Sequence, residues 1–505
     1  MADTNDGDRN SHTEGRKMGR WSRRVALGAS FGAGWIIYFL LQHHTTYHYS
    51  NVMDLSFMFF DANRSGYLPW NNRIYWRGNS GVQDKTRDWR PLDGGYYDAG
   101  DTTKYGLPLA VSFSFLSWGL VDFEKGYNWG QIQTARGIIR WATDYMIKCH
   151  TGEFEFYAQV GSGEEEHKRW ARPEDILNHK TRIGNMVNKT NPGSDVVGAT
   201  AAAMASAAVV FKYADPSYAA ELTWRAQQLY NFGNTYQGFY SDQIPDAKEH
   251  YRSTHYKDDL GWAAIWLYRA TGQYWYVQEA KKHIDSTMYD GVFYHTLAVD
   301  WNFVGHPACL LLYRVTREQK YKRCVETYMD RWIYEFPRTP KGLSYVDFGK
   351  GHTSLRNTAN TALLALAFAK DMRDLKQPMY KAWTYECWAL SQMRYILGSG
   401  GRSFVVGYGK NFPKKPHHRG ASCPTKAYNC DWWAFYTHHW NPNQLTGALV
   451  GGPDKWDNFY DDRTNWQQSE VALDFNAAFT GALARLNQMA NSEGFWRCYS
   501  GTGWL

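Results

Sequence analysis

Two aspartates stand three residues apart in a short segment rich in glycine and tyrosine. The segment reads GGYYDAGD, residues 94–101, and its acids are Asp98 and Asp101. Two carboxylates this close can act on one water molecule, one taking its proton while the other orients it. Inverting hydrolysis of a sugar linkage needs such a base, with a third acid that protonates the leaving group. The ordinary alternative is a turn or a helix cap, because Asp and Gly favour both.

Glu470 is the candidate for the third acid. It lies in DNFYDDRTNWQQSEVALDFNAAF, after a polar stretch and before an apolar helical run. A glutamate at this place can also simply begin a helix. Asp461 lies nearby and is expected to support Glu470 in a network of acids.

A basic segment supplies candidate ligands for a sugar. SFVVGYGKNFPKKPHHRGASCP, residues 403–424, contains His417, His418 and Arg419 after two lysines and a proline. Fixed His and Arg donors could reach sugar hydroxyls, and a plain basic turn is the alternative.

Helical hairpins are the elements expected to position these side chains. Apolar segments at helical spacing dominate, such as ATAAAMASAAVVFKYA and NTALLALAFAK, and strict strand alternation is hard to find. A faint repeat of roughly 50 residues suggests stacked helical hairpins, which could form a solenoid or close into a ring. The long loops 71–105, 152–195, 241–259 and 401–470 are where a site is expected.

The composition is compatible with a flat ligand and argues against nucleic acid. With 24 Trp, 36 Tyr and 25 Phe, aromatics make up 17% of the chain, and their rings can be core or platforms for sugars or bases. The net charge of +7 is mild for 505 residues, and no Lys/Arg run is interleaved with aromatics. A nucleic-acid partner is therefore not expected.

The amino terminus predicts a membrane segment. Residues 1–24 are polar and end in basic residues, and the uncharged stretch 25–41 follows. The excess of Lys/Arg before this stretch places residues 1–24 in the cytoplasm as a polar tail. A retained signal anchor, giving a single-pass type II protein, is favoured over a cleaved signal peptide and a secreted protein. Either places the remaining chain outside the cytoplasm.

Cysteines and sequons bear on the same compartment. The seven cysteines form no CxxC pair, so a zinc site is not expected. Cys423 and Cys430 could close a short loop, and free buried thiols are the alternative. The triplets beginning at Asn63 and Asn188 are glycosylation sequons, which agree weakly with an extracellular or luminal domain.

Together, the three motifs resemble glycoside hydrolase family 9, the endoglucanase family that includes plant and animal cellulases. GGYYDAGDTTKYGLPLA is similar to the family's DAGD segment, residues 403–419 fit its histidine signature, and residues 459–477 fit its acidic signature. The similarity covers about residues 46–490, which are expected to form the catalytic domain, with 491–505 as a C-terminal tail. The resemblance implies an all-α (α/α)6 barrel of helical hairpins with long cleft-forming loops.

The resemblance also implies roles for individual residues. It makes Asp101 the general base, Asp98 a residue that holds the water, and Glu470 the general acid. His417 and Arg419 are expected to contact glucosyl hydroxyls. The cleft residues His167 and Trp170, in EEEHKRWARPED, match the family too, and Trp301 is expected to be a stacking platform. No cofactor is required on this basis.

Several positions depart from the family's pattern. His352, in KGHTSLR, stands near an expected Trp, Phe475 replaces a Tyr, and Ala199 replaces a Glu. WNFVG, residues 301–305, replaces a WDNK-like stretch. THYKDD, residues 254–259, replaces a loop that binds calcium in some members. Asp258 and Asp259 are its possible calcium ligands, although Lys257 counts against a strong site.

The leading hypothesis is an inverting endo-β-1,4-glucanase, anchored at a membrane, whose substrate is cellulose or a related β-1,4-glucan. No carbohydrate-binding module is visible, which is similar to membrane endoglucanases that act beside cellulose synthesis. A secreted digestive cellulase, a processive enzyme, an enzyme for another polysaccharide and a non-catalytic glucan-binding protein are the alternatives.

Overall fold

The computed structural model describes residues 47–176, 182–346, 353–492, 494–495 and 498. The predicted cytoplasmic tail 1–24 and membrane segment 25–41 lie outside these residues, as does His352.

Six helices with almost no exposed face form an inner ring. In α3, for example, apolar residues surround the whole circumference, which is typical of a fully buried helix. The helices contact one another in chain order, and the last contacts the first, so the ring is closed. They are α3 (Gly106–Asp122), α6 (Ser194–Phe211), α10 (Lys257–Thr271), α13 (Gly305–Thr316), α15 (Ser354–Asp374) and α20 (Leu473–Ser492).

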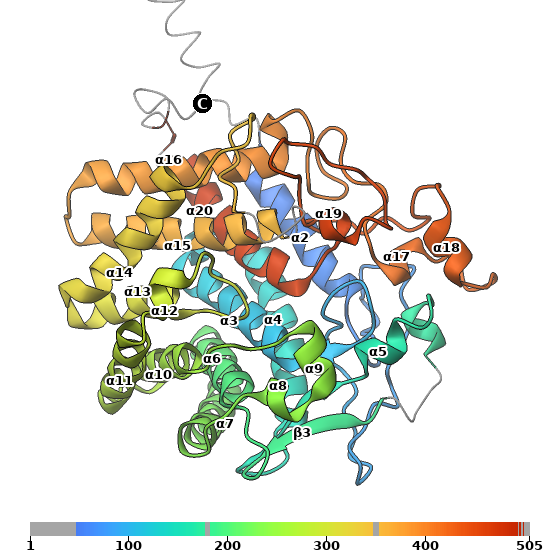
Figure 1. Cartoon of the computed structure of the whole chain (residues 1–505), viewed down its shortest axis with the longest axis horizontal. Helices are drawn as coiled ribbons and strands as arrows, with labels where there is room; N and C mark the ends of the chain where they lie inside the picture. The colour runs from blue at the N-terminus through green and yellow to red at the C-terminus, as the bar shows by residue number, and fades with distance from the viewer. Residues whose placement is uncertain (1–46, 177–181, 347–352, 493, 496–497, 499–505) are drawn as a thin grey trace, which may run out of the picture.

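Six further helices surround this ring. Each packs against an inner helix that is its neighbour in the barrel, and each buries one stripe. In α14 the stripe is Tyr321, Val325, Tyr328 and Met329, at the spacing of one helical face. The outer helices are α2 (Tyr49–Ala62), α4 (Trp129–Cys149), α7 (Pro216–Thr235), α11 (Trp275–Tyr289), α14 (Gln319–Asp330) and α16 (Met379–Arg394). The predicted (α/α)6 barrel is confirmed, and the hairpins close into a ring rather than a solenoid (Figure 1).

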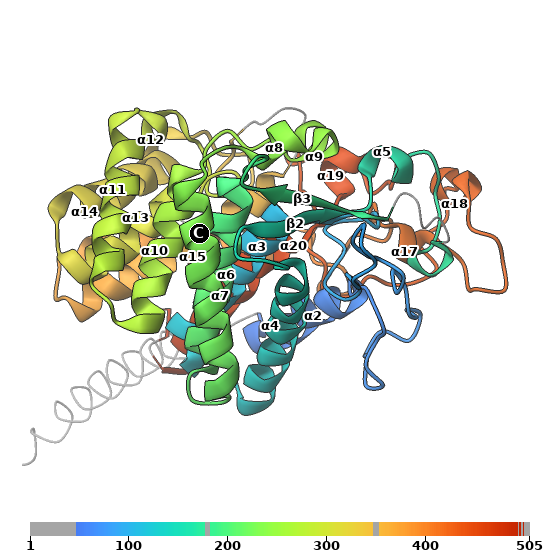
Figure 2. The ribbon, with the colours of Figure 1, turned by 90° about the horizontal axis from the view of Figure 1, so that it is seen from below.

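Short elements connect the barrel helices, and most of them lie at one end of the barrel (Figure 2). A three-stranded antiparallel sheet, which the sequence did not predict, has the order β1 (Lys104–Tyr105), β2 (Glu155–Val160), β3 (Gly184–Asn188). The short α-helices are α5 (Gly163–Glu166), α8 (Tyr240–Gln243), α9 (Pro245–His250), α12 (Val292–His295), α17 (Arg419–Ser422), α18 (Trp432–Tyr436) and α19 (Trp466–Ser469). Single turns of 3₁₀-helix (Glu124–Gly126, Pro173–Asp175) and π-helix (Arg331–Glu335, Tyr395–Ser399) complete the list.

The inner helices all run in the same direction, because each outer helix returns the chain to the end where the next inner helix begins. Their N-terminal ends therefore gather on one face. Figure 2 shows α5, α8, α9 and α19 together with β3 toward this face, while α4 and α7 extend to the opposite end.

One described helix, α6, is long and apolar enough to cross a membrane. Its 18-residue apolar window is 94% buried inside the domain. Burial in the inner ring explains its composition, so α6 is a core helix.

Four of the described cysteines form two disulfides. Cys423–Cys430 closes a short loop, which is one of the two alternatives that the sequence left open, while Cys387–Cys498, which the sequence did not indicate, connects α16 to the C-terminal tail. Cys149, Cys309 and Cys324 are free.

The two sequons differ in the folded chain. Asn63 is 1% exposed, donates to the Phe59 carbonyl at 3.0 Å and contacts His418 Nε2 at 3.2 Å. It is a buried structural residue, so its sequon says nothing about the compartment. Asn188 ends β3 beside the exposed Thr190 and remains a candidate for glycosylation.

Candidate active site

A cleft of about 870 Å³ opens at the N-terminal ends of the inner helices. Many of its lining residues lie shortly before, or in the first turn of, α3, α10, α13, α15 and α20, and the others come from the segments around α5, α9, α17, α18 and α19. It contains the three expected catalytic acids and five expected sugar ligands: Asp98, Asp101, His167, Trp170, Trp301, His417, Arg419 and Glu470. His418 is buried outside the lining. Asp461, Asp258 and Asp259 lie outside its lining.

Backbone hydrogen bonds join the three motifs directly. The Arg419 N–H donates to the Gly100 carbonyl, the His417 N–H to the Ser469 carbonyl, and the Leu473 N–H to the Asp98 carbonyl, each at 2.9 Å. Each motif is thus bonded to the other two, although they are separated by up to several hundred residues in the chain. Gly100 permits this approach, because a Cβ atom there would lie 2.1 Å from the His417 carbonyl oxygen.

Asp98 is the more deeply buried of the two aspartates, at 1% exposure. Its Oδ2 accepts a hydrogen bond from the Tyr251 hydroxyl. Burial and the nearby Asp474 carboxylate raise the pKa of Asp98 well above its ordinary value, and the bond from Tyr251 opposes this rise. Tyr251, which the sequence did not single out, therefore favours the ionised form of Asp98.

Around Asp101, effects that raise the pKa of the carboxyl are opposed by effects that lower it. Its side chain is 15% exposed, and its Oδ1 accepts from the Thr103 N–H at 3.1 Å. Burial raises the pKa of Asp101, and the positive charge of Arg419 and the Thr103 bond hold it down. His167 Nε2 lies 3.7 Å from Asp101 Oδ2, on a half-exposed side chain. Of the two aspartates, Asp101 is the one better placed to be ionised beside a cation.

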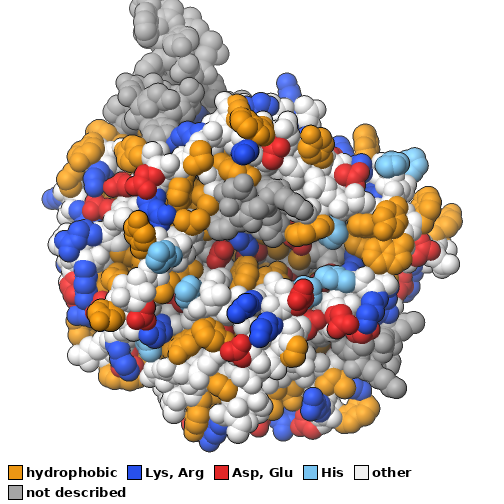
Figure 3. Space-filling view, in the orientation of Figure 1, with side chains coloured by type: hydrophobic (Ala, Val, Ile, Leu, Met, Phe, Trp, Pro, Cys, Tyr) orange, Lys and Arg blue, Asp and Glu red, His pale blue; other side chains and the backbone are white. Residues whose placement is uncertain are grey.

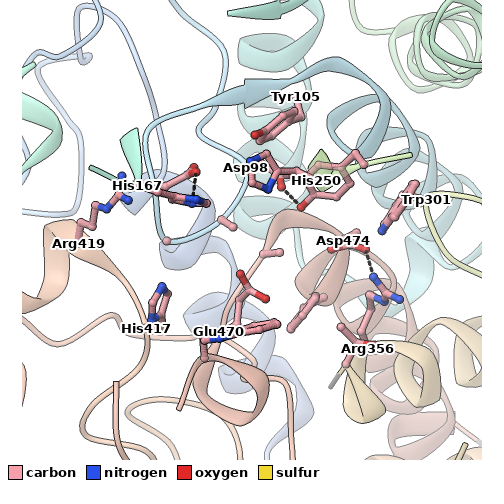
Figure 4. Close-up of a pocket in the computed structure, with 18 of the residues that line it drawn as sticks. Asp98, Tyr105, His167, His250, Trp301, Arg356, His417, Arg419, Glu470 and Asp474 are labelled. Atoms are coloured by element: carbon pink, nitrogen blue, oxygen red, sulfur yellow. Dashed lines mark hydrogen bonds and ion pairs between the residues drawn. The ribbon is translucent and has the colours of Figure 1, made fainter. Parts of the chain in front are cut away.

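Glu470 and His417 lie side by side on paired extended segments. A parallel β-bridge joins the two residues, and the Glu470 carbonyl accepts from the Gly451 N–H at 2.9 Å. Figure 4 shows both on one side of the cavity, with Asp98 and His167 on the other. The acid from the third motif thus faces the aspartates across the cleft.

The protonation of His417 follows from its partner. Its Nδ1 lies 2.6 Å from the Arg463 carbonyl oxygen, which can only accept, so Nδ1 carries the proton. Burial lowers the pKa of His417, so the ring is neutral near pH 7 and Nε2 is an acceptor. The sequence suggested a histidine donor here, and the contact of Nε2 with a sugar hydroxyl stays a prediction.

Arg419 and Trp170 form the wall behind His417. The Trp170 ring packs edge-on against His417 at 5.2 Å, and the Arg419 guanidinium lies 5.3 Å from the Trp170 ring centre. Arg419 Nη1 also pairs with Glu166 at 3.4 Å. Trp170 is 3% exposed and donates to Ser422 Oγ, so it positions His417 and Arg419 and exposes little surface of its own.

A buried ionic network lines the far part of the cleft and was not foreseen. Arg356 pairs with Asp474 at 3.3 Å and with Asp300 at 3.0 Å. Burial raises the pKa of Asp474 to about 6 despite the Arg356 charge. Trp301 stands edge-on to Tyr251, with ring centres 4.9 Å apart. Arg356 is the arginine of the SLR stretch, residues 354–356, which was the available signal.

Asp461 supports the histidine motif from outside the cleft. Its two oxygens accept from the Lys414 and Lys415 N–H groups, at 2.7 and 2.9 Å. It thereby fixes the chain just before His417, and it is a positioning residue.

The expected calcium ligands Asp258 and Asp259 form a buried pair of carboxylates outside the cleft, and their role as ligands stays a prediction. Both are almost fully buried in the first turn of α10, and Asp258 Oδ2 accepts from the Val304 N–H at 2.8 Å. Without a bound cation, burial raises the pKa of Asp258 to about 7 and that of Asp259 well above its ordinary value. Among the described residues, no group of three or more His, Cys, Asp and Glu could hold a metal.

The other residues that depart from the expected pattern are either buried or hydrogen-bonded. Phe475 is buried in the cleft lining, 5.9 Å from the Arg356 guanidinium, and Ala199 is fully buried in α6. In the altered 301–305 stretch, Asn302 exchanges hydrogen bonds with Thr254 at 2.9 and 2.8 Å.

Comparisons with known proteins agree with this architecture. Endoglucanase A of Bacillus pumilus is 37% identical over 462 residues, which cover 88% of this chain and 67% of that protein. Endoglucanase 5 of Arabidopsis thaliana is 36% identical over 497 residues, covering 91% of this chain and 78% of that protein.

Solved structures match in three dimensions. The endoglucanase of the termite Nasutitermes takasagoensis superposes with a TM-score of 0.83 and 41% identity, covering 88% of this chain and all of that one. The cellulase Cel9M of C. cellulolyticum in complex with cellobiose gives 0.78 and 32%, covering 88% and 99%. The model of glycosyl hydrolase family 9 matches residues 49–483, and this chain belongs to that family.

Proposed function

We propose that this protein is an inverting endo-β-1,4-glucanase that hydrolyses internal β-1,4-glucosidic bonds of cellulose or a related β-glucan. The observation that carries the proposal is the closed junction of the three motifs, which brings Asp98, Asp101 and Glu470 into one cleft. Membership of family 9 and the resemblance to endoglucanases of bacteria, plants and a termite support it.

In this mechanism Asp101 is the general base. It removes a proton from a water molecule that Asp98 helps to hold, and the water oxygen attacks the anomeric carbon. Glu470, across the cleft, gives its proton to the glycosidic oxygen as the bond to the leaving chain breaks. Attack opposite to the leaving group inverts the configuration. A neutral His417 accepts a hydrogen bond from a glucosyl hydroxyl, and Arg419 donates one to a neighbouring hydroxyl. Trp301 stacks on a sugar ring.

Product analysis of the full-length protein tests this mechanism. NMR should detect the α-anomer first during hydrolysis of cello-oligosaccharides. Asp101→Asn and Glu470→Gln should each lower kcat by about 10²–10⁴-fold, the usual contribution of a general base or acid. Glu221→Gln, on the exposed face of α7, is the matched control and should keep wild-type turnover. A β-anomer as the first product, or full activity in either cleft variant, contradicts the mechanism.

We further propose that residues 25–41 anchor the enzyme in a membrane, with the catalytic domain outside the cytoplasm. The uncharged stretch and the basic residues before it support this. The two disulfides agree, because such bonds persist in oxidising compartments. After expression in a eukaryotic cell, the protein should stay in the membrane on carbonate extraction, with a glycan on Asn188 and none on Asn63. Release into the medium would instead favour a secreted cellulase.

A further inference from the structure

An aromatic loop, residues 424–440, stands beside the cleft with large rings exposed to solvent. Trp432, Trp433, Tyr436 and Trp440 have exposed fractions of 38%, 69%, 65% and 69%. We name these four residues the aromatic shelf. Figure 3 shows hydrophobic side chains gathered over α18, on the right of the view. Single exposed aromatics are common, but a group of this kind marks a binding surface.

The loop that carries the shelf is held rigidly. Arg463, fully buried, donates to the carbonyls of Ala434, Thr437 and His439, at 3.0, 2.6 and 2.6 Å. A buried guanidinium is costly unless its donors are satisfied, and here the backbone of the loop that carries the shelf satisfies them. The Cys423–Cys430 disulfide closes the base of the loop.

A second arginine fixes the start of the loop. Arg172 Nη1 donates to the carbonyls of Pro424, Thr425 and Tyr428, at 3.0, 3.1 and 2.8 Å. Rings held in place before a ligand arrives lose little conformational entropy on binding. The loop is therefore built to present its aromatics.

The shelf continues the wall of the cleft. Trp432 lines the cleft, and its ring centre lies 6.2 Å from that of Trp170. On the outer side, the Tyr436 ring lies 6.2 Å from Trp432, with the two planes tilted by only 34°. Arg463, which holds the shelf, also accepts the His417 Nδ1–H through its carbonyl. One residue thus fixes the shelf and the catalytic-cleft histidine relative to each other.

We infer that the aromatic shelf is an additional glucan-binding site, on which glucosyl units of a long β-1,4-glucan stack after the chain leaves the cleft beside Trp170 and His417. This inference rests on the proposed function. The occupant follows from continuity with the cleft, since Trp432 lines the cleft and is exposed, and a chain that passes over Trp432 is directed onto its neighbour Tyr436. The apolar faces of β-linked glucosyl rings suit Trp and Tyr, whose polar edges can meet hydroxyls.

The test compares long and short substrates with the full-length protein. The readout is the ratio of kcat/KM on carboxymethylcellulose to that on cellotetraose. In the double variant Trp433→Ala, Trp440→Ala and in Tyr436→Ala, this ratio should fall by about tenfold, the effect of losing one or two stacking contacts. The Trp433→Phe, Trp440→Phe variant keeps the rings and should restore most of the ratio.

Trp129→Ala is the matched control. Trp129 is 77% exposed at the start of the outer helix α4, at the end of the barrel away from the cleft, so its loss should leave the ratio unchanged. Equal melting temperatures would show that the variants fold. A ratio that is unchanged in the alanine variants overturns the inference, whether or not those variants also lose self-association.

Affinity electrophoresis in gels containing β-glucan separates this inference from the proposed function. If the wild type hydrolyses neither substrate, the proposed function fails. Retardation of the wild type that is weakened in the alanine variants would still establish the shelf, and equal mobility would overturn it.

Discussion

The residues Asp98 and Asp101 are three positions apart in the chain but occupy different electrostatic environments. Asp98 is sealed from solvent near Asp474, and the Tyr251 hydroxyl donates to it. Asp101 has the Arg419 cation nearby and retains contact with solvent. Such a difference suits a division of labour, because a base must exchange its proton whereas an orienting carboxylate must stay fixed.

Tyr251→Phe should shift the pH dependence of activity. Without the hydroxyl, the ionised form of Asp98 loses a hydrogen bond, so its pKa rises further. If activity needs ionised Asp98, the acidic limb of the profile of activity against pH moves to higher pH. Activity then falls most at low pH. A hydrogen bond to a charged group contributes about 1.5–3 kcal/mol, which is roughly a 10–100-fold loss in kcat/KM. Profiles of kcat/KM against pH measure this.

The comparison variant is Tyr230→Phe, in which a buried hydroxyl that bonds Glu279 on the outer helices is removed. It should leave the pH profile in place. An acidic limb in Tyr251→Phe that coincides with the wild type would show that Tyr251 does not tune Asp98.

At the scale of elements, the cleft depends on how closely its loops dock. The DAGD loop precedes α3, the histidine motif leads into α17, and the acidic motif precedes α20. The barrel brings α3 and α20 together, since they are neighbours where the inner ring closes. The small sheet adds a further connection, because β2 pairs with β1 next to the aspartates and leads toward α5 and His167.

Gly100→Ala should disrupt this docking. The added Cβ would meet the His417 carbonyl at 2.1 Å, and both partners are backbone that cannot move independently. We expect kcat to fall by about 10²-fold, because small displacements of a catalytic group have effects of this size. Gly137→Ala is the control, since its Cβ would have nothing within 4 Å and it lies within α4. That variant should be active and stabilised by roughly 0.5–1 kcal/mol. Wild-type activity in Gly100→Ala would contradict the proposed tight junction.

At the scale of the molecule, a closed ring of helices must hold its last turn against its first. α20 packs against α2, α3 and α15, and the chain beyond it returns to α16 through Cys387–Cys498. Phe495 in this tail also contacts Tyr49, near the beginning of α2. The predicted tail 491–505 is thus, in its described residues, part of the domain.

Cys387→Ser should lower the stability of the whole domain. The disulfide joins residues 111 positions apart, and a cross-link over such a distance typically contributes about 2–4 kcal/mol by restricting the unfolded chain. The melting temperature should fall, and a reducing agent should have little further effect through this pair. Cys324→Ser removes a free thiol and serves as the control. An equal melting temperature for Cys387→Ser and the wild type would contradict a stabilising link.

Much of the molecule could be predicted from local patterns. Helical periodicity indicates the hairpins, because burial of a face imposes its spacing on the side chains. The three motifs indicate the chemistry, because a base, an orienting carboxylate and an acid are what inverting hydrolysis needs. The partners Tyr251, Asp474 and Arg463 could not be foreseen, since nothing in their neighbouring residues states what they will contact.

The sequence by itself determined the helical class, the family and the identity of the acids, because these depend on periodicity and on motifs whose residue types are dictated by chemistry. The tertiary structure decided the protonation of His417, the burial of Asn63 and of Asp258, and the union of the shelf with the cleft. These depend on solvent exclusion and on contacts between distant segments. Only the closed barrel brings such segments together.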